Sequence, residues 1–419
     1  MLPTFHRRWF LKGSLGAAAL ASLPTIIPAT AFGANERVVT GHIGLGGQGM
    51  SNLRPFIKQA AAVCEVDTVR LGKAIAAVEK EGGKPTGFGD YRKLLERKDI
   101  DAVVISTPDH WHTLPALHAM QAGKDVYCEK PLTLTVAEGR KLVEVARAEK
   151  RILQTGSQQR SDAKFRLGCE LVRNGKIGKL KQVLVGIPGP NHPGEPVPDS
   201  DPPKDLDYEM WLGPAPFRPY NSKRVHYNFR FFWDYSGGQM TNWGAHHIDI
   251  AQWGLGMDAS GPVSVGGVAT FHPKKWHDVT ETCRITCTYA NGVELIIGQG
   301  QKDIPGGTTF IGEDGTVFVN RGVIKTTPEE LATKPGDLAT KLYVSANHHR
   351  NFLDCVASRE LPICDVEIGH RSATVCHLAN HAVRLGRKLT WDPAAEKIIG
   401  DDEATKALER PYRKPWKLA

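Results

Sequence analysis

A glycine-rich turn near the start of the chain has the composition of a phosphate-binding loop. Residues 44–49 read Gly-Leu-Gly-Gly-Gln-Gly, directly after the β-prone run 37–43 and before an expected helix at 50–60. In a G-x-G-x-x-G pattern the first glycine makes the tight turn, the second lets the backbone approach a pyrophosphate, and the third lets helix pack on strand. Free N–H groups at the helix start then face the phosphates. We therefore expect a dinucleotide to be bound by Gly44, Gly46, Gly47, Gln48 and Gly49.

A carboxylate follows this loop at the distance expected for a ribose ligand. Glu65 comes directly after the second apolar run, 61–64, and lies 21 residues after Gly44. An acid at this distance hydrogen-bonds the adenosine ribose hydroxyls and repels a 2′-phosphate. The sequence therefore predicts NAD rather than NADP as the cofactor, with Arg70 as a residue that could partly undo this preference.

The stretch that carries these residues alternates between strand and helix. β-type runs at 100–106, 125–128 and 152–155 are separated by helical runs at 114–122 and 136–149. This alternation predicts a doubly wound parallel sheet, in which ligands bind at the carboxyl ends of the strands. The alternation fades further along the chain, where β-type patterns take over and a Pro-rich stretch, 187–219, predicts a long loop near the active site.

The composition is that of a globular protein of two or possibly three domains. Of the 419 residues, 41% are hydrophobic and 23% are charged, and no apolar run reaches the roughly 20 residues that span a bilayer. The net charge is +8, but the basic residues are scattered, so we do not expect a nucleic-acid partner. The eight cysteines form no Cys-x-x-Cys pair, which indicates buried small side chains rather than a disulfide framework or a metal site.

The first 31 residues have the layout of a cleavable export signal. A basic start containing Arg7 and Arg8 precedes a mildly apolar stretch, 15–27, and small residues at 29–31. The paired arginines resemble a twin-arginine signal. This resemblance implies the twin-arginine export machinery as a partner, export of an already folded protein to the periplasm, and a tightly held ligand.

Four motifs, in this order, resemble the Gfo/Idh/MocA family of nicotinamide-dependent oxidoreductases. They are the loop at 44–49, Ser-Thr-Pro-Asp-His-Trp-His at 106–112, Glu-Lys-Pro at 129–131, and Gly-Gly-Gln-Met-Thr-Asn-Trp-Gly-Ala-His-His-Ile-Asp at 237–249. Together they are specific, and the resemblance covers roughly residues 36–390.

The resemblance implies an α/β fold of two domains. An N-terminal Rossmann domain, with a doubly wound parallel sheet, is expected at 36–158 after the signal at 1–31. A C-terminal α/β domain with an open, mostly antiparallel sheet is expected at 159–390, followed by a tail at 391–419. The second domain would bind substrate and form a homodimer or homotetramer through its sheet.

The resemblance also assigns the candidate catalytic residues, Lys130, His246 and Asn242. The lysine matching Lys130 is a catalytic acid/base that orients the substrate hydroxyl, and the histidine matching His246 is a proton acceptor. Asn242 stands where the family has aspartate, and an amide can orient an imidazole but cannot stabilise its charged form. Either Lys130 carries more of the proton transfer here or the chemistry has changed. Asp249 lies three residues after His246, close enough to orient it.

Further candidates come from the same motifs and their surroundings. Cofactor-binding residues, besides the loop and Glu65, are expected to be Thr107, Pro108, His112, Glu129, Lys130 and Gln158. Substrate-binding residues are expected to be Lys130, Arg160, Tyr227, Arg230, Trp233, Asn242, His246 and His247. Aromatic faces and charged hydrogen-bonding groups suit a carbohydrate, with ordinary packing of an aromatic-rich segment as the alternative. His348 and His349 are expected to be structural rather than metal ligands.

Three functions fit these residues. The leading one is an NAD-dependent oxidoreductase that transfers hydride between a secondary hydroxyl of a sugar, glycoside or cyclitol and the nicotinamide. The second is a redox-neutral enzyme with tightly bound NAD, either a glycosidase that oxidises the sugar transiently or a sugar–sugar oxidoreductase. The third is a non-catalytic nucleotide-binding sensor.

Overall fold

The first sheet in the chain is built from parallel strands. The computed structural model describes residues 37–189 and 194–418, so the expected export signal at 1–31 lies outside the described residues. Among the described residues, six strands form this sheet in the order β3-β2-β1-β4-β5-β6. They are β1 (Thr40–Ile43), β2 (Ala60–Cys64), β3 (Thr86–Phe88), β4 (Ala102–Ile105), β5 (Asp125–Cys128) and β6 (Leu153–Thr155). The predicted Rossmann sheet is therefore confirmed.

Helices follow the strands of this sheet, as the alternation predicts. They are α1 (Gly47–Leu53), α2 (Thr68–Lys80), α3 (Tyr91–Leu95), α4 (Thr113–Gln121) and α5 (Val136–Ala148). The α5 helix begins with a capping box in which Thr135 and Glu138 satisfy each other's backbone N–H groups. The helix predicted at 50–60 is displaced: α1 begins at Gly47, and a short 3-10 helix, Arg54–Phe56, takes over where Pro55 lacks an N–H donor.

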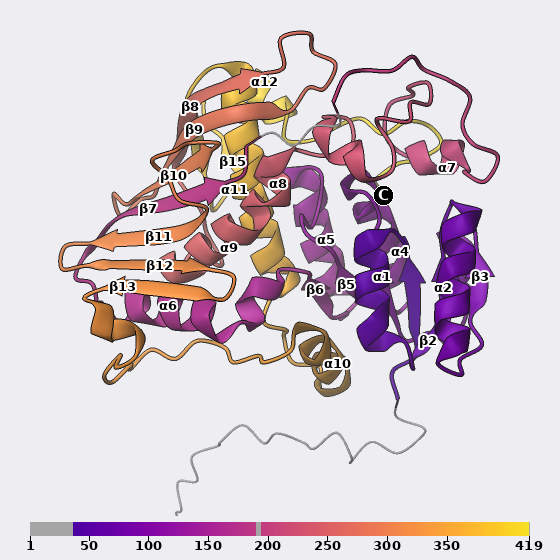
Figure 1. Cartoon of the computed structure of the whole chain (residues 1–419), viewed down its shortest axis with the longest axis horizontal. Coiled ribbons are helices and arrows are strands. Elements are labelled where there is room, and N and C mark those ends of the chain that lie inside the picture. The colour runs from indigo at the N-terminus through magenta and orange to yellow at the C-terminus, as the bar shows by residue number, and fades with distance from the viewer. Residues whose placement is uncertain (1–36, 190–193, 419) are drawn as a thin grey trace, which may run out of the picture. The chain divides into compact units, whose positions relative to one another are not determined.

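The second sheet is mostly antiparallel, also as predicted. Its described strands lie in the order β13-β12-β11-β7-β10-β9-β8-β14-β15, and only the β7–β10 pair is parallel (Figure 1). They are β7 (Leu180–Ile187), β8 (Ser264–Phe271), β9 (Thr280–Thr288), β10 (Glu294–Gln299), β11 (Gly307–Gly312), β12 (Thr316–Asn320), β13 (Val323–Thr327), β14 (Leu389–Asp392) and β15 (Lys397–Ile398).

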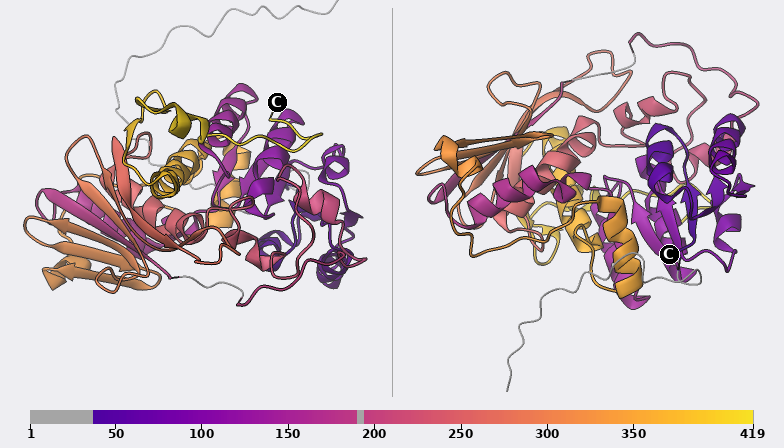
Figure 2. Two further views of the ribbon diagram at one scale, coloured as in Figure 1. Left: turned by 90° about the horizontal axis from the view of Figure 1, so that it is seen from above. Right: turned by 60° about the horizontal axis from the view of Figure 1, so that its bottom comes forward.

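One face of the second sheet is covered by helices. The α6 (Ala163–Arg173), α9 (Gly244–Leu255) and α11 (Val366–Leu385) helices pack on it, and Figure 2 shows them on one side only. Every second side chain along these strands packs against the helices, and together they form the largest hydrophobic core. The other face is open, and Val268 on β8 is 72% exposed there. The oligomer expected through this face stays a prediction.

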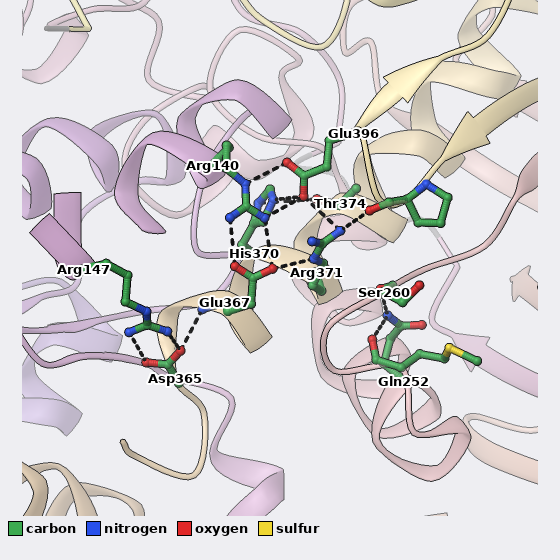
Figure 3. Close-up of polar contacts among 12 residues, drawn as sticks. Arg140, Arg147, Gln252, Ser260, Asp365, Glu367, His370, Arg371, Thr374 and Glu396 are labelled. Atoms are coloured by element: carbon green, nitrogen blue, oxygen red, sulfur yellow. Dashed lines mark hydrogen bonds and ion pairs between the residues drawn. The ribbon is translucent and has the colours of Figure 1, made fainter. Parts of the chain in front are cut away.

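An ion-pair network joins the α5 helix of the Rossmann domain to the second domain. The guanidinium of Arg140 donates to Glu367 on α11 and to Glu396 beside β15, with N–O distances of 2.9 and 2.8 Å (Figure 3). Also from α11, Arg371 pairs with both carboxylates, and His370 contacts Glu396. These contacts fix how the two domains face each other across the cavity described below.

The C-terminal residues 391–418 form ordered structure rather than a simple tail. After β15 and α12 (Asp402–Lys406), the chain returns to the Rossmann domain. There Tyr412 donates its hydroxyl to Glu138, and the Trp416 ring lies edge-on to Trp111 with a centroid distance of 4.8 Å. The α10 helix (His348–Ser358) packs Phe352 against the same domain. Both segments therefore cross back over the domain boundary drawn from the sequence.

Two further expectations concern cysteines and membranes. All eight cysteines are free and buried, as predicted. Within the described part of the chain, no helix has the length and apolar character needed to cross a membrane.

Candidate active site

A cavity of about 880 Å³ opens at the carboxyl ends of β1, β4 and β5 and extends to the second domain. Most of the residues singled out in the sequence line it: Gly44, Gly46, Gly47, Gln48, Glu65, Thr107, Pro108, His112, Glu129, Lys130, Gln158, Tyr227, Arg230, Asn242 and His246. The described part of the Pro-rich stretch contributes Met210 and Trp211 from α7 (Tyr208–Leu212). The structure thus brings the nucleotide motif and the candidate catalytic residues to one site.

The glycine loop leaves room for a ligand where a side chain would otherwise stand. Gly44 has a φ of 84°, and a Cβ there would lie 2.7 Å from the backbone nitrogen of Thr107. A Cβ on Gly49 would lie 2.0 Å from the Gly44 oxygen, so Gly49 serves helix–strand packing and does not line the cavity. A Cβ on Gly47 would meet no atom within 4 Å. This open backbone at the start of α1 fits a dinucleotide pyrophosphate.

Glu65 lies at the end of β2 and is held by the backbone around it. Its Oε2 accepts the N–H of Leu45 at 2.7 Å, and its Oε1 accepts the N–H of Val66 at 2.8 Å. Burial raises the pKa of the Glu65 carboxyl, while these hydrogen bonds act against that rise. Arg70 also lines the cavity, with Nη1 close to Gly46. This arrangement fits a ribose, and it places a cation within reach of a 2′ substituent.

Glu129 is fixed by three donors at the base of the cavity. Asn52 and Gln48 donate their side-chain amides to its Oε1 at 2.9 and 3.1 Å, and the N–H of Lys130 donates to its Oε2 at 3.2 Å. Gln158 donates to the hydroxyl of Tyr127 beside this group. In contrast, the Thr107 hydroxyl is buried without a hydrogen-bond partner among the described residues, as expected for a group that meets a ligand.

Lys130 contacts Asn242 directly across the two domains. Its Nζ donates to the Asn242 side-chain oxygen at 3.1 Å and lies 3.3 Å from the Asn242 backbone oxygen. Asn242 ends α8 (Gln239–Asn242) and donates its amide to Gln239 at 3.0 Å. Burial lowers the pKa of Lys130, and nearby arginines lower it further, although Glu129 and Asp109 oppose the shift. The amide of Asn242 therefore positions the lysine rather than the imidazole of His246.

His246 lies at the start of α9 and faces the cavity. Burial lowers the pKa of its imidazole well below the usual value, and the charges of Lys130 and Arg321 add to this. Its Nδ1 has no hydrogen-bond partner in residues 37–189 and 194–418. The imidazole is therefore neutral at pH 7 and free to accept or donate a hydrogen bond to a ligand.

Asp249 does not orient His246, contrary to the sequence-based expectation. Its carboxylate accepts from Arg160 Nε at 2.8 Å and from the Ser372 hydroxyl at 2.7 Å. Arg160 is only 1% exposed, pairs also with Asp258, and does not line the cavity. A buried guanidinium paired with two carboxylates is part of the core, so the placement of Arg160 argues against its predicted role in substrate binding.

Two other predicted substrate residues also lie away from the cavity. The His247 ring stacks on Trp243 at an interplanar angle of 14°, and burial lowers its pKa to about 4. Trp233 is held between the guanidinium groups of Arg384 and Arg410, each 4.0 Å from the ring centroid. Both side chains pack against neighbouring groups and neither lines the cavity, so neither is placed to touch a substrate there.

Some residues that line the cavity were missed in the sequence. Arg321 follows β12 and lies with its guanidinium 4.7 Å from the ring centroid of Trp243. Asp109 is buried and accepts the Ser236 hydroxyl at 2.6 Å. Asp109 belongs to the motif at 106–112 and could have been included on that ground. Nothing local in the sequence marks Arg321, because only the fold of the second sheet brings it here.

The comparisons with known proteins agree with this architecture. Residues 39–157 match the family model for the NAD-binding Rossmann fold of the GFO_IDH_MocA oxidoreductase family. Residues 194–418, more than half of the chain, match the model for the C-terminal alpha/beta domain of this oxidoreductase family. Residues 4–24 match a twin-arginine translocation signal sequence. The chain therefore belongs to the Gfo/Idh/MocA family of oxidoreductases and carries a twin-arginine signal.

Similar proteins include both hydrolases and dehydrogenases. An alpha-N-acetylgalactosaminidase of Shewanella oneidensis is 29% identical over 206 residues, which cover 43% of this chain and 45% of that protein. The chain thus matches about half the length of this curated relative. The WlbA dehydrogenase of Bordetella pertussis, solved with NADH and UDP-GlcNAcA, has a TM-score of 0.62 at 20% identity, covering 85% of this chain and 99% of that one. The aldose-aldose oxidoreductase of Caulobacter crescentus, with glycerol, has a TM-score of 0.63 at 18% identity, covering 84% and 100%.

Proposed function

We propose that this protein is an NAD-dependent oxidoreductase that transfers hydride between a secondary hydroxyl of a sugar, glycoside or cyclitol and the nicotinamide. The observation that carries this proposal is the contact of half-buried Lys130 with Asn242 in the cavity that also contains the glycine loop. A bound dinucleotide would supply the hydride acceptor. The side chains of this protein would bind the two reactants and move the proton.

The proposed cofactor is NAD because of Glu65. Its carboxylate lies at the end of β2, where it would face the ribose, and a 2′-phosphate placed there would meet its negative charge. Arg70 lies on the same side of the cavity and softens this discrimination. The cofactor-binding roles of the glycine loop, Thr107, Pro108, His112, Glu129 and Gln158 follow from their place around the cavity.

Lys130 is the proposed proton acceptor. Its ammonium pairs with no acidic side chain in the part of the chain that the structure describes, and burial lowers its pKa. A lysine held by an amide oxygen can lose its proton more readily than one paired with a carboxylate. The neutral amine would take the proton of the substrate hydroxyl as hydride leaves the same carbon, and Asn242 would keep the amine in place.

A redox-neutral reaction is the second candidate, and the presence of two half-buried bases favours it. Simple oxidation of a hydroxyl needs one base, whereas the cavity contains both Lys130 and the neutral imidazole of His246. A transient ketone acidifies the neighbouring C–H, and a second base could take that proton while the glycosidic oxygen departs. Water addition and return of the hydride would complete hydrolysis. The similarity to an alpha-N-acetylgalactosaminidase agrees with this alternative.

The proposed location is the periplasm, reached by folded export. The match of residues 4–24 to a twin-arginine signal supports this route. Free cofactor would be scarce there, so we propose that the dinucleotide enters the cavity before export and stays bound.

The proposed function is tested by a single-turnover experiment on the purified mature protein. The protein receives one equivalent of NAD and a panel of sugars, glycosides and cyclitols, and both reduced-cofactor absorbance and products are measured. One oxidised product per cofactor supports a dehydrogenase. Product far above the cofactor, with little reduced cofactor left, supports the redox-neutral reaction. Bound NAD that no member of the panel reduces or turns over would contradict both and favour a sensor.

A further inference from the structure

We propose that His272, His277 and Glu281 bind a divalent metal ion, with zinc as the best match. Each residue offers one ligand atom, and these three atoms all lie within 4.8 Å of one another. His277 is only 2% exposed, and its Nε2 lies 3.9 Å from the Glu281 carboxylate. The rings of His272 and His277 have a centroid distance of 4.5 Å. This cluster lies outside the cavity of the candidate active site.

The backbone holds two of the three ligands in place. His272 directly follows β8 and Glu281 belongs to β9, two strands that pair along their length (Figure 1). The last pair of this ladder, Phe271 with Thr280, lies next to both ligands. The third ligand, His277, comes from the loop between the strands. Ligand residues on paired strands are already held in place, so they lose little conformational entropy when an ion binds.

The donor set decides which ion fits. Two imidazoles and one carboxylate are ligands that suit zinc, and they leave one position for water. A tetrahedral ion with bonds of about 2.1 Å needs donor atoms roughly 3.4 Å apart. To bind the ion, the three donor atoms must move closer together by about an ångström. The partly exposed side chains of His272 and Glu281 can make this movement.

An ion here would hold one wall of the candidate active site. The loop that contains His277 also carries Trp276, whose ring lies edge-on to Phe232, and Asp278, which accepts the N–H of Trp233 at 2.6 Å. These contacts support the segment Tyr227–Phe231, which lines the cavity with Tyr227, Phe229 and Arg230. The proposed role of the metal is therefore to fix this wall, and it does not require the ion to touch a substrate.

The test measures metal binding directly and needs no turnover. Untagged full-length protein is freed of metal with a chelator and titrated with zinc in competition with a chromophoric chelator. Cobalt is then used as a spectroscopic probe, because a four-coordinate site gives a visible absorption. We expect one tight equivalent of zinc, the cobalt absorption, and a higher midpoint of thermal unfolding with zinc.

Ligand variants separate this site from unspecific binding by histidines. His272→Asn and Glu281→Gln each remove one ligand from a partly exposed position, so folding is expected to persist, with NAD binding as the check. We expect each to weaken zinc binding at least tenfold and to abolish the cobalt absorption. His118→Gln is the control, because that partly buried histidine hydrogen-bonds Tyr91 in the other domain. Zinc binding that is absent in the unsubstituted protein, or equal in the ligand variants and the control, would overturn the proposal.

Discussion

The nucleotide side and the substrate side of the cavity are built in different ways. On the nucleotide side, bare backbone at Gly47 and the hydrogen-bonded carboxylates of Glu65 and Glu129 face the cavity. On the substrate side stand basic groups with few partners. Among the described residues, Arg230 and Arg321 form no ion pair, and one nitrogen of His246 has no partner.

This difference indicates which side is complete before a ligand arrives. Side chains that are already hydrogen-bonded to their neighbours need little rearrangement on binding, so the nucleotide side is preorganised for the same cofactor in every turnover. The buried Nδ1 of His246 is costly to leave unpaired unless a ligand or water satisfies it. We therefore propose that substrate binding and specificity depend on the side with the unpaired basic groups.

Removing the amine of Lys130 should cause the largest effect. We expect Lys130→Met to lower turnover by roughly 10²–10⁴-fold, the usual contribution of a positioned acid or base. The affinity for NAD should change little, because the loop and Glu65 remain. Single-turnover kinetics and calorimetric NAD binding measure the two effects. Lys93→Met, at an exposed position, is the control; turnover of Lys130→Met near that of the control would refute the assignment.

Replacing His246 should separate the two candidate reactions. His246→Gln is expected to lower turnover roughly 10²-fold or more if the imidazole takes a carbon-bound proton, as the redox-neutral reaction requires. If only a hydroxyl is oxidised, Lys130 suffices and the loss should stay near tenfold. Product analysis and single-turnover rates are measured on the same samples. An unchanged rate would remove His246 from the site.

Removing the charge of Glu65 should alter the nucleotide side alone. Glu65→Gln keeps the shape but can no longer repel a 2′-phosphate. We expect NAD binding to weaken about tenfold, or ~1.4 kcal/mol, while NADP binding improves relative to it. Calorimetry with both dinucleotides gives the ratio. If this ratio does not move, the carboxylate does not face the ribose.

The Arg140 network should affect stability without touching either side of the cavity. Arg140→Gln removes hydrogen bonds to two partly buried carboxylates, with an expected loss of about 1–3 kcal/mol in the free energy of unfolding. Denaturant unfolding measures this loss, and Arg350→Gln, from an exposed pair with Asp354, should cost less. An effect no larger than that of the control would show that the network does not stabilise the domain contact.

The same network predicts a pH dependence. Hydrogen bonds from Arg140 and the neighbouring side chains hold the pKa values of Glu367 and Glu396 below the usual 4.5. The stabilisation is therefore present at neutral pH and is lost as pH falls below that value. Unfolding measured over this range should show a smaller loss of stability for Arg140→Gln than for the unsubstituted protein.

The nucleotide side could be predicted from the sequence because its information is local. The glycine loop, Glu65 and the Glu-Lys-Pro motif each lie at the end of a strand, and a parallel sheet brings such ends together. The parallel sheet could be predicted from the alternation of strands and helices, whereas the mostly antiparallel second sheet was implied by the family resemblance.

The substrate side depends on contacts that the sequence does not reveal. Arg160 and Asp249 lie beside functional motifs, yet they pair with each other in the core. Arg321 reaches the cavity only because the second sheet places β12 next to it. Asn242 and His246 lie on separate helices, α8 and α9, and the partner of the Asn242 amide is Lys130, 112 residues away in the sequence.

The central claim is that an amide at position 242 leaves Lys130 able to act as a base. The pH dependence of single-turnover oxidation, compared between the unsubstituted protein and Asn242→Asp, tests it most directly. We predict a rate that rises with pH through an apparent pKa below the usual 10.5 of lysine, and a higher apparent pKa when a carboxylate contacts the amine. The same apparent pKa in both proteins would contradict the account.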